Sequence, residues 1–370
     1  MREFLNGSEA IVRGALDAGC NFFAGYPITP ATPILLSMIK ELPKVGGVAI
    51  QAEDEIAALG FCIGAAMAGA RVMTATSGPG ISLYSENIGA GIIGEVPLVI
   101  VDCQRLGPST GGATTVGQGD VQFLRWGTSG GYPVIVLCPA SVPECYSLTL
   151  HAFDLAERYR LPVFLATDKE MVATKMTVDI DAFERISVRE RNLISAEEKF
   201  IPYHLDDVKF VPPMSSIGGP HLVRFSTSSH DEYGYLSRDP DAVGPIHLHL
   251  EEKINSFKDN IAMVESDLHE GAEILLISYG ITARSMYSAA RIARSDGKAL
   301  STITIQTLWP VPERALLNAM EGIKKIIVTE LNLGQYAREV ERLAKNGQEV
   351  IGVHRVDGRL ITPSEILERL

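Results

Sequence analysis

The stretch "QAEDEIAALGFCIGAAMAGARVMTATSGPG", residues 51–80, joins an acidic start, a long run of small and apolar residues, a β-branched run and a glycine turn. Residues 56–70 are apolar or small on every side of a helix, which predicts a helix buried all round and packed through Ala and Gly. Residues 71–77 read as a strand that is buried on both faces. A buried helix that leads into such a strand indicates an α/β protein with a parallel sheet.

The same unit recurs on both sides of this stretch. Short apolar strands separated by helical patterns are expected at 21–26, 47–51, 71–77, 97–102, 133–138 and 162–167, and again at 273–278, 300–306, 325–330 and 349–354. We therefore predict two three-layer α/β domains with mainly parallel sheets, over residues 1–185 and 266–370. Residues 186–265 break the rhythm with scattered prolines and glycines, which predicts an irregular or β-ribbon connection.

Composition limits the classes of function. The chain has 370 residues and a net charge of −12, so its surface should repel nucleic acid and anionic membranes. An 18-residue apolar run and a signal-peptide core are both missing from the sequence, which predicts a cytoplasmic protein. The five cysteines contain no C-x-x-C pair, so we predict buried thiols and no metal or iron–sulfur site on this chain.

Four motifs follow successive predicted strands, and GYPITP (25–30) is the first. Each proline fixes its own φ and favours an extended residue before it, so Thr29 should be held in place. An ordinary turn that ends a strand is the alternative interpretation. In the second motif, Glu53, Asp54 and Glu55 crowd the first turn of a helix. One acid is enough for the helix dipole, so we expect Glu55, the third, to face an interior pocket.

The third and fourth motifs could bind anions. Ser77 and Gly78 lie in a glycine turn between strand and helix, where backbone N–H groups can hold a negative charge. This turn has neither the Lys of a P-loop nor the G-x-G-x-x-G spacing, which disfavours a nicotinamide dehydrogenase. Arg105 ends a strand and suits two-pronged binding of a carboxylate or phosphate, with a solvated surface arginine as the alternative.

Together the four motifs indicate a protein family more specifically than any one motif does alone. GYPITP, residues 51–89 and DCQRLGPSTGGATTVGQGDVQFLRWGT (102–128) closely resemble the α subunit of 2-oxoacid:ferredoxin oxidoreductases, especially the 2-oxoglutarate type. ELNLGQYAREVERL (330–343) and VDGRLITPSEIL (356–367) resemble the second domain of that family. The resemblance implies a thiamine-diphosphate pyrimidine-binding domain followed by a transketolase C-terminal-like domain. It also implies oxidative decarboxylation of a 2-oxoacid with coenzyme A, giving acyl-CoA, CO2 and reduced ferredoxin.

The resemblance also implies roles for individual residues. Many thiamine enzymes carry an acid nine positions before a helix glycine, and Glu55 precedes Gly64 by nine (64 − 55), so Glu55 would activate the cofactor. Thr29 would meet the cofactor or the substrate carboxylate, which Arg105 would neutralise. The cofactor-binding candidates are Tyr26, Pro27, Ile28, Thr29, Glu55, Ser77 and Gly78; the substrate-binding candidates are Thr29, Arg105, Ser109 and Thr110. His230 and Asp231, in TSSHDEYG, stay open between an approach to the site and an exposed turn.

A G-D-G segment, which would hold Mg²⁺ and diphosphate, does not occur in the sequence. The resemblance places that segment and the iron–sulfur cluster on a β subunit, so this chain would hold half of a shared site. Three alternatives stay open: a thiamine enzyme of another class, such as a non-oxidative decarboxylase; a catalytically silent assembly or anion-binding subunit; and a preference for pyruvate or branched-chain 2-oxoacids over 2-oxoglutarate.

Overall fold

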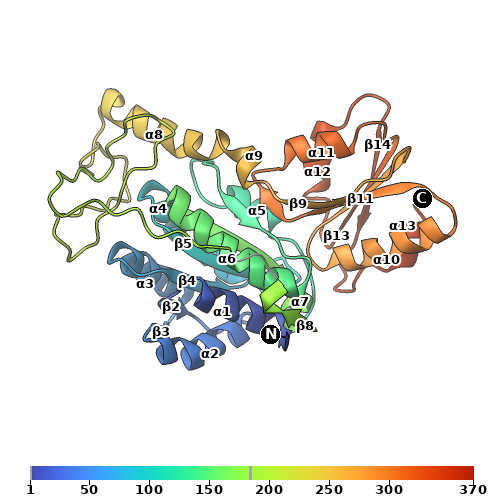
Figure 1. Cartoon of the computed structure of the whole chain (residues 1–370), viewed down its shortest axis with the longest axis horizontal. Helices are drawn as coiled ribbons and strands as arrows, with labels where there is room; N and C mark the ends of the chain where they lie inside the picture. Colours follow the sequence, from blue (N-terminus) through green and yellow to red (C-terminus); the bar gives the residue numbers. More distant parts are fainter. Residues whose placement is uncertain (1, 183–185) are drawn as a thin grey trace.

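A computed structural model describes residues 2–182 and 186–370, which form two α/β bodies lying side by side (Figure 1). The first body is built on a seven-stranded sheet in which all strands but one edge strand run parallel. In spatial order its strands are β12 (Thr307–Trp309), β6 (Ile135–Leu137), β7 (Pro162–Asp168), β5 (Leu98–Gln104), β4 (Val72–Thr76), β2 (Phe22–Gly25) and β3 (Val48–Gln51). The predicted α/β class with mainly parallel sheets is confirmed.

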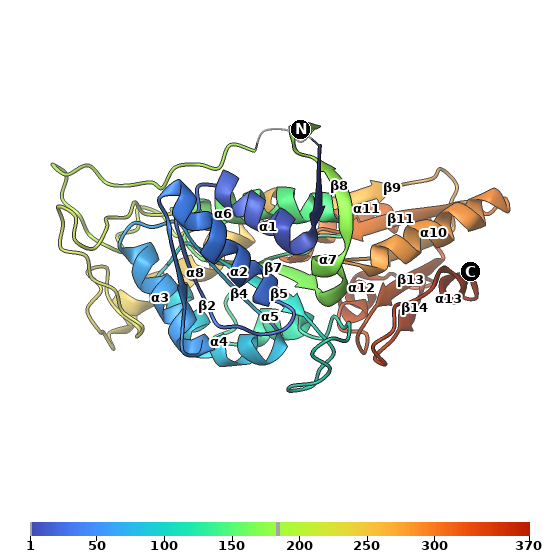
Figure 2. The same ribbon diagram turned by 90° about the horizontal axis from the view of Figure 1, so that it is seen from below.

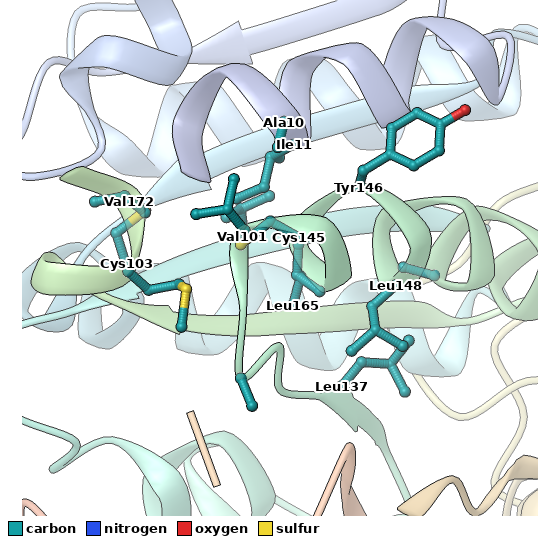
Figure 3. Packing of buried hydrophobic residues seen from close by; sticks show 14 of the residues in the cluster. Ala10, Ile11, Val101, Cys103, Leu137, Cys145, Tyr146, Leu148, Leu165 and Val172 are labelled. Carbon is teal, nitrogen blue, oxygen red and sulfur yellow. The ribbon is translucent and has the colours of Figure 1, made fainter. Parts of the chain in front are cut away.

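Helices cover both faces of this sheet, because its strands are apolar on both sides. One face carries α1 (Gly7–Asp17), α2 (Thr32–Glu41) with the short helix η1 (Leu42–Val45), and α6 (Val142–Tyr159). The other carries α3 (Glu55–Met67), α4 (Gly78–Ile93) and α5 (Val121–Trp126). Figure 3 shows the first of these layers, where Ile11 of α1 and Cys145 of α6 pack in one cluster with Val101 and Leu165 of the sheet.

A two-stranded ribbon and a short helix complete the first body. The ribbon pairs β1 (Arg2–Asn6) antiparallel with β8 (Lys175–Asp179), and it is followed by the turn η2 (Ile180–Ala182). The helix α7 (Lys169–Ala173) directly follows β7. The expected domain boundary at residue 185 lies outside the described residues.

The second body is a smaller three-layer unit. Its five-stranded sheet has the order β14 (Glu349–His354), β13 (Lys325–Glu330), β10 (Ile274–Ser278), β11 (Leu300–Ile305) and β9 (Val264–Asp267), with only β9 antiparallel. The helices α10 (Thr282–Ser295) and α13 (Pro363–Leu367) cover one face, and α11 (Glu313–Ala319) and α12 (Ala337–Leu343) cover the other.

The connection differs from the expectation. Residues 186–239 contain no helix or strand beyond isolated bridges, but α8 (Pro240–Asn255) and α9 (Lys258–Ile261) follow. The prediction of an irregular or β-ribbon segment is therefore wrong for α8 and α9, while residues 186–239 are irregular. The alternation of polar and apolar residues in HLHLEEKI (247–254) suggests a strand. However, Ile246, Leu250 and Ile254 are buried at a spacing of four residues, which is the spacing along one face of a helix.

The two bodies are also interleaved. Immediately after β11 of the second sheet, the chain crosses to the first sheet and adds β12 antiparallel to β6. Three residues inside the predicted second domain thus form an edge strand of the first sheet, a segment too short for periodicity to detect. Both apolar clusters include residues from the two bodies, so the domains share their cores.

The strand order positions a ligand crevice. From β2 the chain passes through α2 to β3 on one side, and then through α3 to β4 on the other side. Because α2 and α3 lie on opposite faces, the carboxyl ends of β2 and β4 flank a topological switch point, where open α/β sheets bind ligands. Among residues 2–182 and 186–370, no helix has the length and apolarity needed to cross a bilayer.

Candidate active site

The predicted site residues converge on one edge of the first sheet. Arg105 directly follows β5, Ser77 follows β4 and Tyr26 follows β2, while Glu55 begins α3 just beyond β3. These four strands are neighbours in the order β5-β4-β2-β3, and their carboxyl ends point the same way. The motifs that are separated along the sequence therefore meet at the switch point.

Arg105 is the most constrained of these residues. Its side chain spans the end of β4 to reach the turn after β2, where Nη1 donates to the Thr29 carbonyl at 2.6 Å. Nη2 donates to the Thr110 carbonyl at 2.9 Å, and Nε has no acceptor among the described residues. Arg105 is only 5% exposed, yet no ion pair joins it to a carboxylate within residues 2–182 and 186–370. Its hydrogen bonds go only to neutral carbonyl groups, and its charge also acts on the buried carboxyl group of Asp120.

The other members of the two loops lie nearer the surface. Thr29 is exposed, so its hydroxyl is available, and its peptide bond to Pro30 is cis. Tyr26 and Ile28 are half-buried and Pro27 is exposed. Thr110 reaches Arg105 through its carbonyl and not through its hydroxyl.

Ser109 is exposed in a left-handed turn with a φ of 53°. No hydrogen bond connects Ser109 to Arg105 among the contacts of the described residues. Its expected place in the substrate pocket stays a prediction.

The three acids at the start of α3 differ in exposure and in hydrogen bonding. Asp54 caps the helix, because its Oδ1 accepts a hydrogen bond from the Ala57 N–H at 2.7 Å. Glu53 is exposed, whereas Glu55 is buried at 7% exposure, as the sequence predicts for the acid that faces inward. Since capping is done by Asp54, the carboxyl group of Glu55 is available for another purpose.

Gly80 brings Glu55 close to the end of β4. A Cβ atom on Gly80 would lie 2.0 Å from Thr76 Oγ1, 3.0 Å from Glu55 Cγ and 3.2 Å from Glu55 Oε1. Only a glycine leaves room for both side chains at this point in the first turn of α4. The glycine turn therefore shapes the site in addition to offering backbone N–H groups.

A row of buried polar atoms without partners runs along the ends of β4 and β5. Within the described part of the chain these atoms are Thr76 Oγ1, Ser77 Oγ, both carboxyl oxygens of Asp102, Gln104 Nε2, Arg105 Nε and Asp120 Oδ2. Native proteins satisfy nearly all buried polar groups, so a row of unsatisfied ones at a switch point indicates a site for a polar ligand. Because the row contains both donors and acceptors, a ligand that pairs with it must offer both, as an aminopyrimidine ring does.

Sequence analysis missed several of these residues. Thr76, Asp102, Gln104 and Asp120 were not expected to contribute. One signal was present: Asp102 is a carboxylate inside the buried strand LVIVDCQ, and a buried charge needs a partner. Burial raises the pKa of Asp102 well above its usual value, and the neighbouring Asp120 raises it further. The pKa of Asp120 is also raised by burial, against the opposing effect of Arg105.

His230 and Asp231 are not joined to this edge by any contact of the described residues. His230 is fully buried, with Nδ1 2.8 Å from the Asp231 carbonyl and its ring stacked 4.0 Å from that of Tyr203. The Asp231 carboxylate accepts hydrogen bonds from the N–H groups of Tyr233 and Tyr235, each at 2.9 Å. In this chain the pair forms a local turn, but the turn is not exposed as the second interpretation expects, because His230 is fully buried.

One side of the site is bordered by an exposed apolar surface. Ile56 and Phe61 of α3 are 54% and 48% exposed, and Leu83 of α4 is 49% exposed. The exposed residues Gly60 and Gly64 lie on the same side of α3. The prediction that α3 is buried all round is therefore wrong for the single chain. The name α3–α4 surface is used below for Ile56, Gly60, Phe61, Gly64 and Leu83.

Comparisons with known proteins agree across the whole chain. A family model described as pyruvate flavodoxin/ferredoxin oxidoreductase, thiamine diphosphate-binding, matches residues 13–242. A second, described as pyruvate:ferredoxin oxidoreductase core domain II, matches residues 272–366. The chain is 43% identical to the 2-oxoglutarate synthase subunit KorA of Methanothermobacter thermautotrophicus, covering 99% of this chain and 97% of the relative. It is 34% identical to the ketoisovalerate oxidoreductase subunit VorB of the same organism, covering 100% and 97%.

Solved structures are similar as well. The 2-oxoglutarate:ferredoxin oxidoreductase from Magnetococcus marinus, with 2-oxoglutarate, coenzyme A and succinyl-CoA bound, superposes with a TM-score of 0.93 at 31% identity. The match covers 100% of this chain and 64% of that chain, so this protein spans under two thirds of that neighbour. A split-gene transketolase superposes with a TM-score of 0.57 at 11% identity over 99% and 97% of the two chains, which is a likeness of fold alone.

Proposed function

Because the chain belongs to the pyruvate flavodoxin/ferredoxin oxidoreductase family, we propose that it is a subunit of a thiamine-diphosphate-dependent 2-oxoacid:ferredoxin oxidoreductase that acts on 2-oxoglutarate. The observation that carries this proposal is the buried guanidinium of Arg105, which hydrogen-bonds only to two backbone carbonyls and leaves its Nε without an acceptor among the described residues. A buried charged group with an unused N–H is costly, and a ligand carboxylate would accept a hydrogen bond from that N–H. A 2-oxoacid carries such a carboxylate directly beside its reacting carbon.

Arg105 would bind and orient the substrate. Its Nη1 and Nη2 already donate to the carbonyls of Thr29 and Thr110, which fixes the plane of the guanidinium. The unpaired Nε then remains for a charge-assisted hydrogen bond to the carboxylate. Thr29, whose carbonyl contacts Arg105 and whose side chain is exposed, would use its hydroxyl to hold the same carboxylate or the cofactor.

Thiamine diphosphate, when bound, supplies the nucleophilic carbon and the electron sink that decarboxylation requires. The row of unpaired atoms at the ends of β4 and β5 fits a ring that carries both donors and acceptors. Glu55 would hold a proton at the pyrimidine-facing side of this row, since its carboxyl group makes no hydrogen bond with the described residues. Ser77 and the Gly78 turn would line the opposite side, and burial would keep water from the proton transfers.

The site would be completed by a partner subunit. The α3–α4 surface places two large apolar side chains of α3 beside Glu55 and leaves them about half exposed. Scattered exposed apolar residues need no explanation, but a contiguous group with small residues between suits a close helix contact. We infer that a β subunit covers this surface and brings the diphosphate and Mg²⁺ site and the iron–sulfur cluster, with coenzyme A and ferredoxin as co-substrates.

The proposed substrate rests on the relatives. Those named 2-oxoglutarate synthase subunits are up to 43% identical to this chain, against 34% for the ketoisovalerate oxidoreductase subunits. The higher identity favours 2-oxoglutarate over a branched-chain 2-oxoacid. Both kinds of substrate share the carboxylate that Arg105 would bind, so the difference must be measured directly.

The test is coenzyme-A-dependent reduction of a viologen dye by this chain purified with its partner, comparing 2-oxoglutarate, pyruvate and 2-oxoisovalerate. Glu55→Gln should lower kcat by about 10²- to 10⁴-fold, the usual range for loss of a general acid–base group. Glu53→Gln, which changes an exposed acid two residues away, is the matched control and should retain activity. If a cofactor-loaded complex oxidises none of the three acids, the chain is a silent assembly subunit and the proposal is wrong.

A further inference from the structure

Two carboxyl groups lie against each other behind the glycine turn. Asp102 is fully buried in β5, and Asp120 immediately precedes α5. Their side chains are within hydrogen-bonding reach of each other. However, neither carboxyl oxygen of Asp102 nor Oδ2 of Asp120 meets a donor among the described residues. The pair is therefore not explained by capping or by an ion pair.

A single shared proton explains this arrangement. Two ionised carboxylates both accept, so they cannot hydrogen-bond to each other, and their charges repel strongly in a buried position. One proton turns the same contact into a short hydrogen bond between a carboxylic acid and a carboxylate. Because burial and mutual repulsion raise the pKa of Asp102, while Arg105 opposes the rise at Asp120, the proton belongs on Asp102 and the charge on Asp120.

The pair is connected to the site through two contacts. The N–H of Asp120 donates to Gln104 Oε1 at 3.1 Å, and Gln104 is the neighbour of Arg105 in the chain. Asp120 Oδ2 also lies 3.6 Å from the position that a Cβ of Gly78 would take. The carboxylate of Asp120 thus borders the glycine turn on one side and the strand end that carries Arg105 on the other.

We propose that Asp102 and Asp120 share one proton, and that this proton sets the negative charge near Arg105 and hence the affinity of Arg105 for the substrate carboxylate. With the proton present, the pair carries one negative charge, which balances the guanidinium. Without it, the pair carries two and repels an incoming anion. The two acids are positioning residues that act through Arg105, and this role rests on the proposed function.

Other ionisable groups surround the pair. On β5 these are Arg105 and the buried thiol of Cys103, whose pKa burial raises well above its usual value. On β7, Asp168 is buried, and burial raises its pKa to about 6. Asp168 differs from the pair because its carboxylate accepts hydrogen bonds from the N–H groups of Met171 and Ile281. Substitution of Asp102 alone separates the pair from this second acid.

The first test measures proton binding and needs no substrate. In the unfolded chain Asp102 loses its proton near its ordinary pKa of 3.8, but in the folded protein it keeps the proton to higher pH. The wild type should therefore lose stability as pH rises above that value, whereas Asp102→Asn, whose amide cannot ionise, should not. For each pH unit above the ordinary pKa of Asp102, as long as the folded protein keeps the proton, the unfolding constant of the wild type should rise roughly tenfold relative to that of the variant. Asp296→Asn, at an exposed position, is the control and should follow the wild type.

The second test measures catalysis by the full complex. In the wild type, KM for 2-oxoglutarate should rise with pH as the shared proton is lost, by roughly tenfold for one added charge near a carboxylate site. Asp102→Asn should flatten this rise, because an amide keeps donating a hydrogen bond to Asp120 at all pH values. In both proteins kcat should change less than KM, since the pair affects substrate binding.

The outcomes are distinguishable. If the unfolding curves of wild type and Asp102→Asn run parallel from pH 4 to pH 9, the shared proton does not exist and the inference is overturned, whatever the substrate. If the proton is found but KM follows the same pH profile in both proteins, its role at Arg105 is overturned. If the wild-type complex oxidises no 2-oxoacid, the proposed function fails together with that role, while the unfolding test still decides the proton.

Discussion

Two buried polar regions of this molecule differ in whether their polar groups have hydrogen-bond partners. This difference distinguishes a region that is available to a ligand from a region that stabilises the fold. The first is the site edge at the ends of β4 and β5. The second is the seam between the two bodies, where the loop after β5 meets the segment after β13 (Figure 2). Both consist of amide, carboxyl and hydroxyl groups with almost no exposure. They differ in how many of those groups have partners.

In the seam the polar groups are paired. Asn332 Nδ2 donates to the Gln118 carbonyl and to Tyr279 Oη, both at 2.7 Å. Tyr279 Oη donates in turn to Glu330 Oε2 at 2.8 Å, and the two carboxyl oxygens of Glu330 also accept from the N–H groups of Tyr336 and Ala337. Only the hydroxyl of Tyr336 in this network lacks a partner among the described residues, and a buried network that is satisfied to this extent fixes one geometry.

At the site edge the equivalent groups are unpaired, and each such group costs about 1–3 kcal/mol relative to a satisfied one. That cost is tolerated because the rest of the fold offsets it, and it is recovered when a ligand supplies the missing partners. The two regions are joined by one loop, which begins at Arg105 and passes through Gln118 in the seam before it reaches Asp120. The satisfied region thus holds the unsatisfied one in place.

The largest effect that tests this contrast is expected at Arg105. Arg105→Met removes the charge but keeps an apolar stem, so kcat/KM for the 2-oxoacid should fall by roughly a hundredfold, equivalent to about 3 kcal/mol. Stability should change much less, because among the described residues the arginine donates hydrogen bonds only to two backbone carbonyls and makes none to a carboxylate. Steady-state kinetics and urea unfolding measure the two quantities, with Arg284→Met at an exposed position as control. A larger loss of stability than of activity would show that Arg105 is structural.

A smaller effect is expected at Gly80. An alanine Cβ there would lie 2.0 Å from Thr76 Oγ1 and 3.0 Å from Glu55 Cγ, so one of these side chains must move. Overpacking of this kind costs about 1–3 kcal/mol, and displacement of Glu55 should lower kcat as well.

Gly244→Ala is the matched control, because Gly244 also lies in a helix but has nothing within 4 Å of its Cβ position. There the change should raise the unfolding free energy by up to about 1 kcal/mol, through helix propensity alone. If the two alanine variants behave alike in activity and unfolding, Gly80 does not shape the site.

Much of the fold could be predicted from the sequence, because most strands of the two large sheets are short apolar runs; β9, with the sequence VESD, is polar and was not expected. The exceptions have physical causes. The helix α8 shows alternating letters that mimic a strand, and β12 is only three residues long. In both cases the local letter pattern is too short or too ambiguous to show which part of the fold the segment packs against.

The residues of the candidate site also divide into those that the sequence indicates and those that only the fold brings together. Glu55 and Arg105 could be proposed from the sequence, because an extra acid in the first turn of an apolar helix and an arginine at the end of a strand are both visible there. The Asp102–Asp120 pair could not, since 18 residues separate its members (120 − 102) and only the folded loop brings them together. The exposed side of α3 was misjudged for another reason: an apolar helix has the same composition whether its outer side faces a core or a partner.

The smallest of the three effects is expected in the seam. Asn332→Ala removes a side chain that donates to both the Gln118 carbonyl and Tyr279 Oη, and leaves those acceptors buried. Loss of such a bond costs about 1–3 kcal/mol, so unfolding should begin at a lower urea concentration. Asn318→Ala, at an exposed position, should unfold like the wild type. Because Asn332 contacts the loop at Gln118 but makes no hydrogen bond with the residues of the site edge, activity under stabilising conditions should fall mainly through KM, as Arg105 becomes less well placed. A loss of kcat as large as that of Glu55→Gln would mean that the seam takes part in the chemistry, and the division between paired and unpaired regions would be wrong.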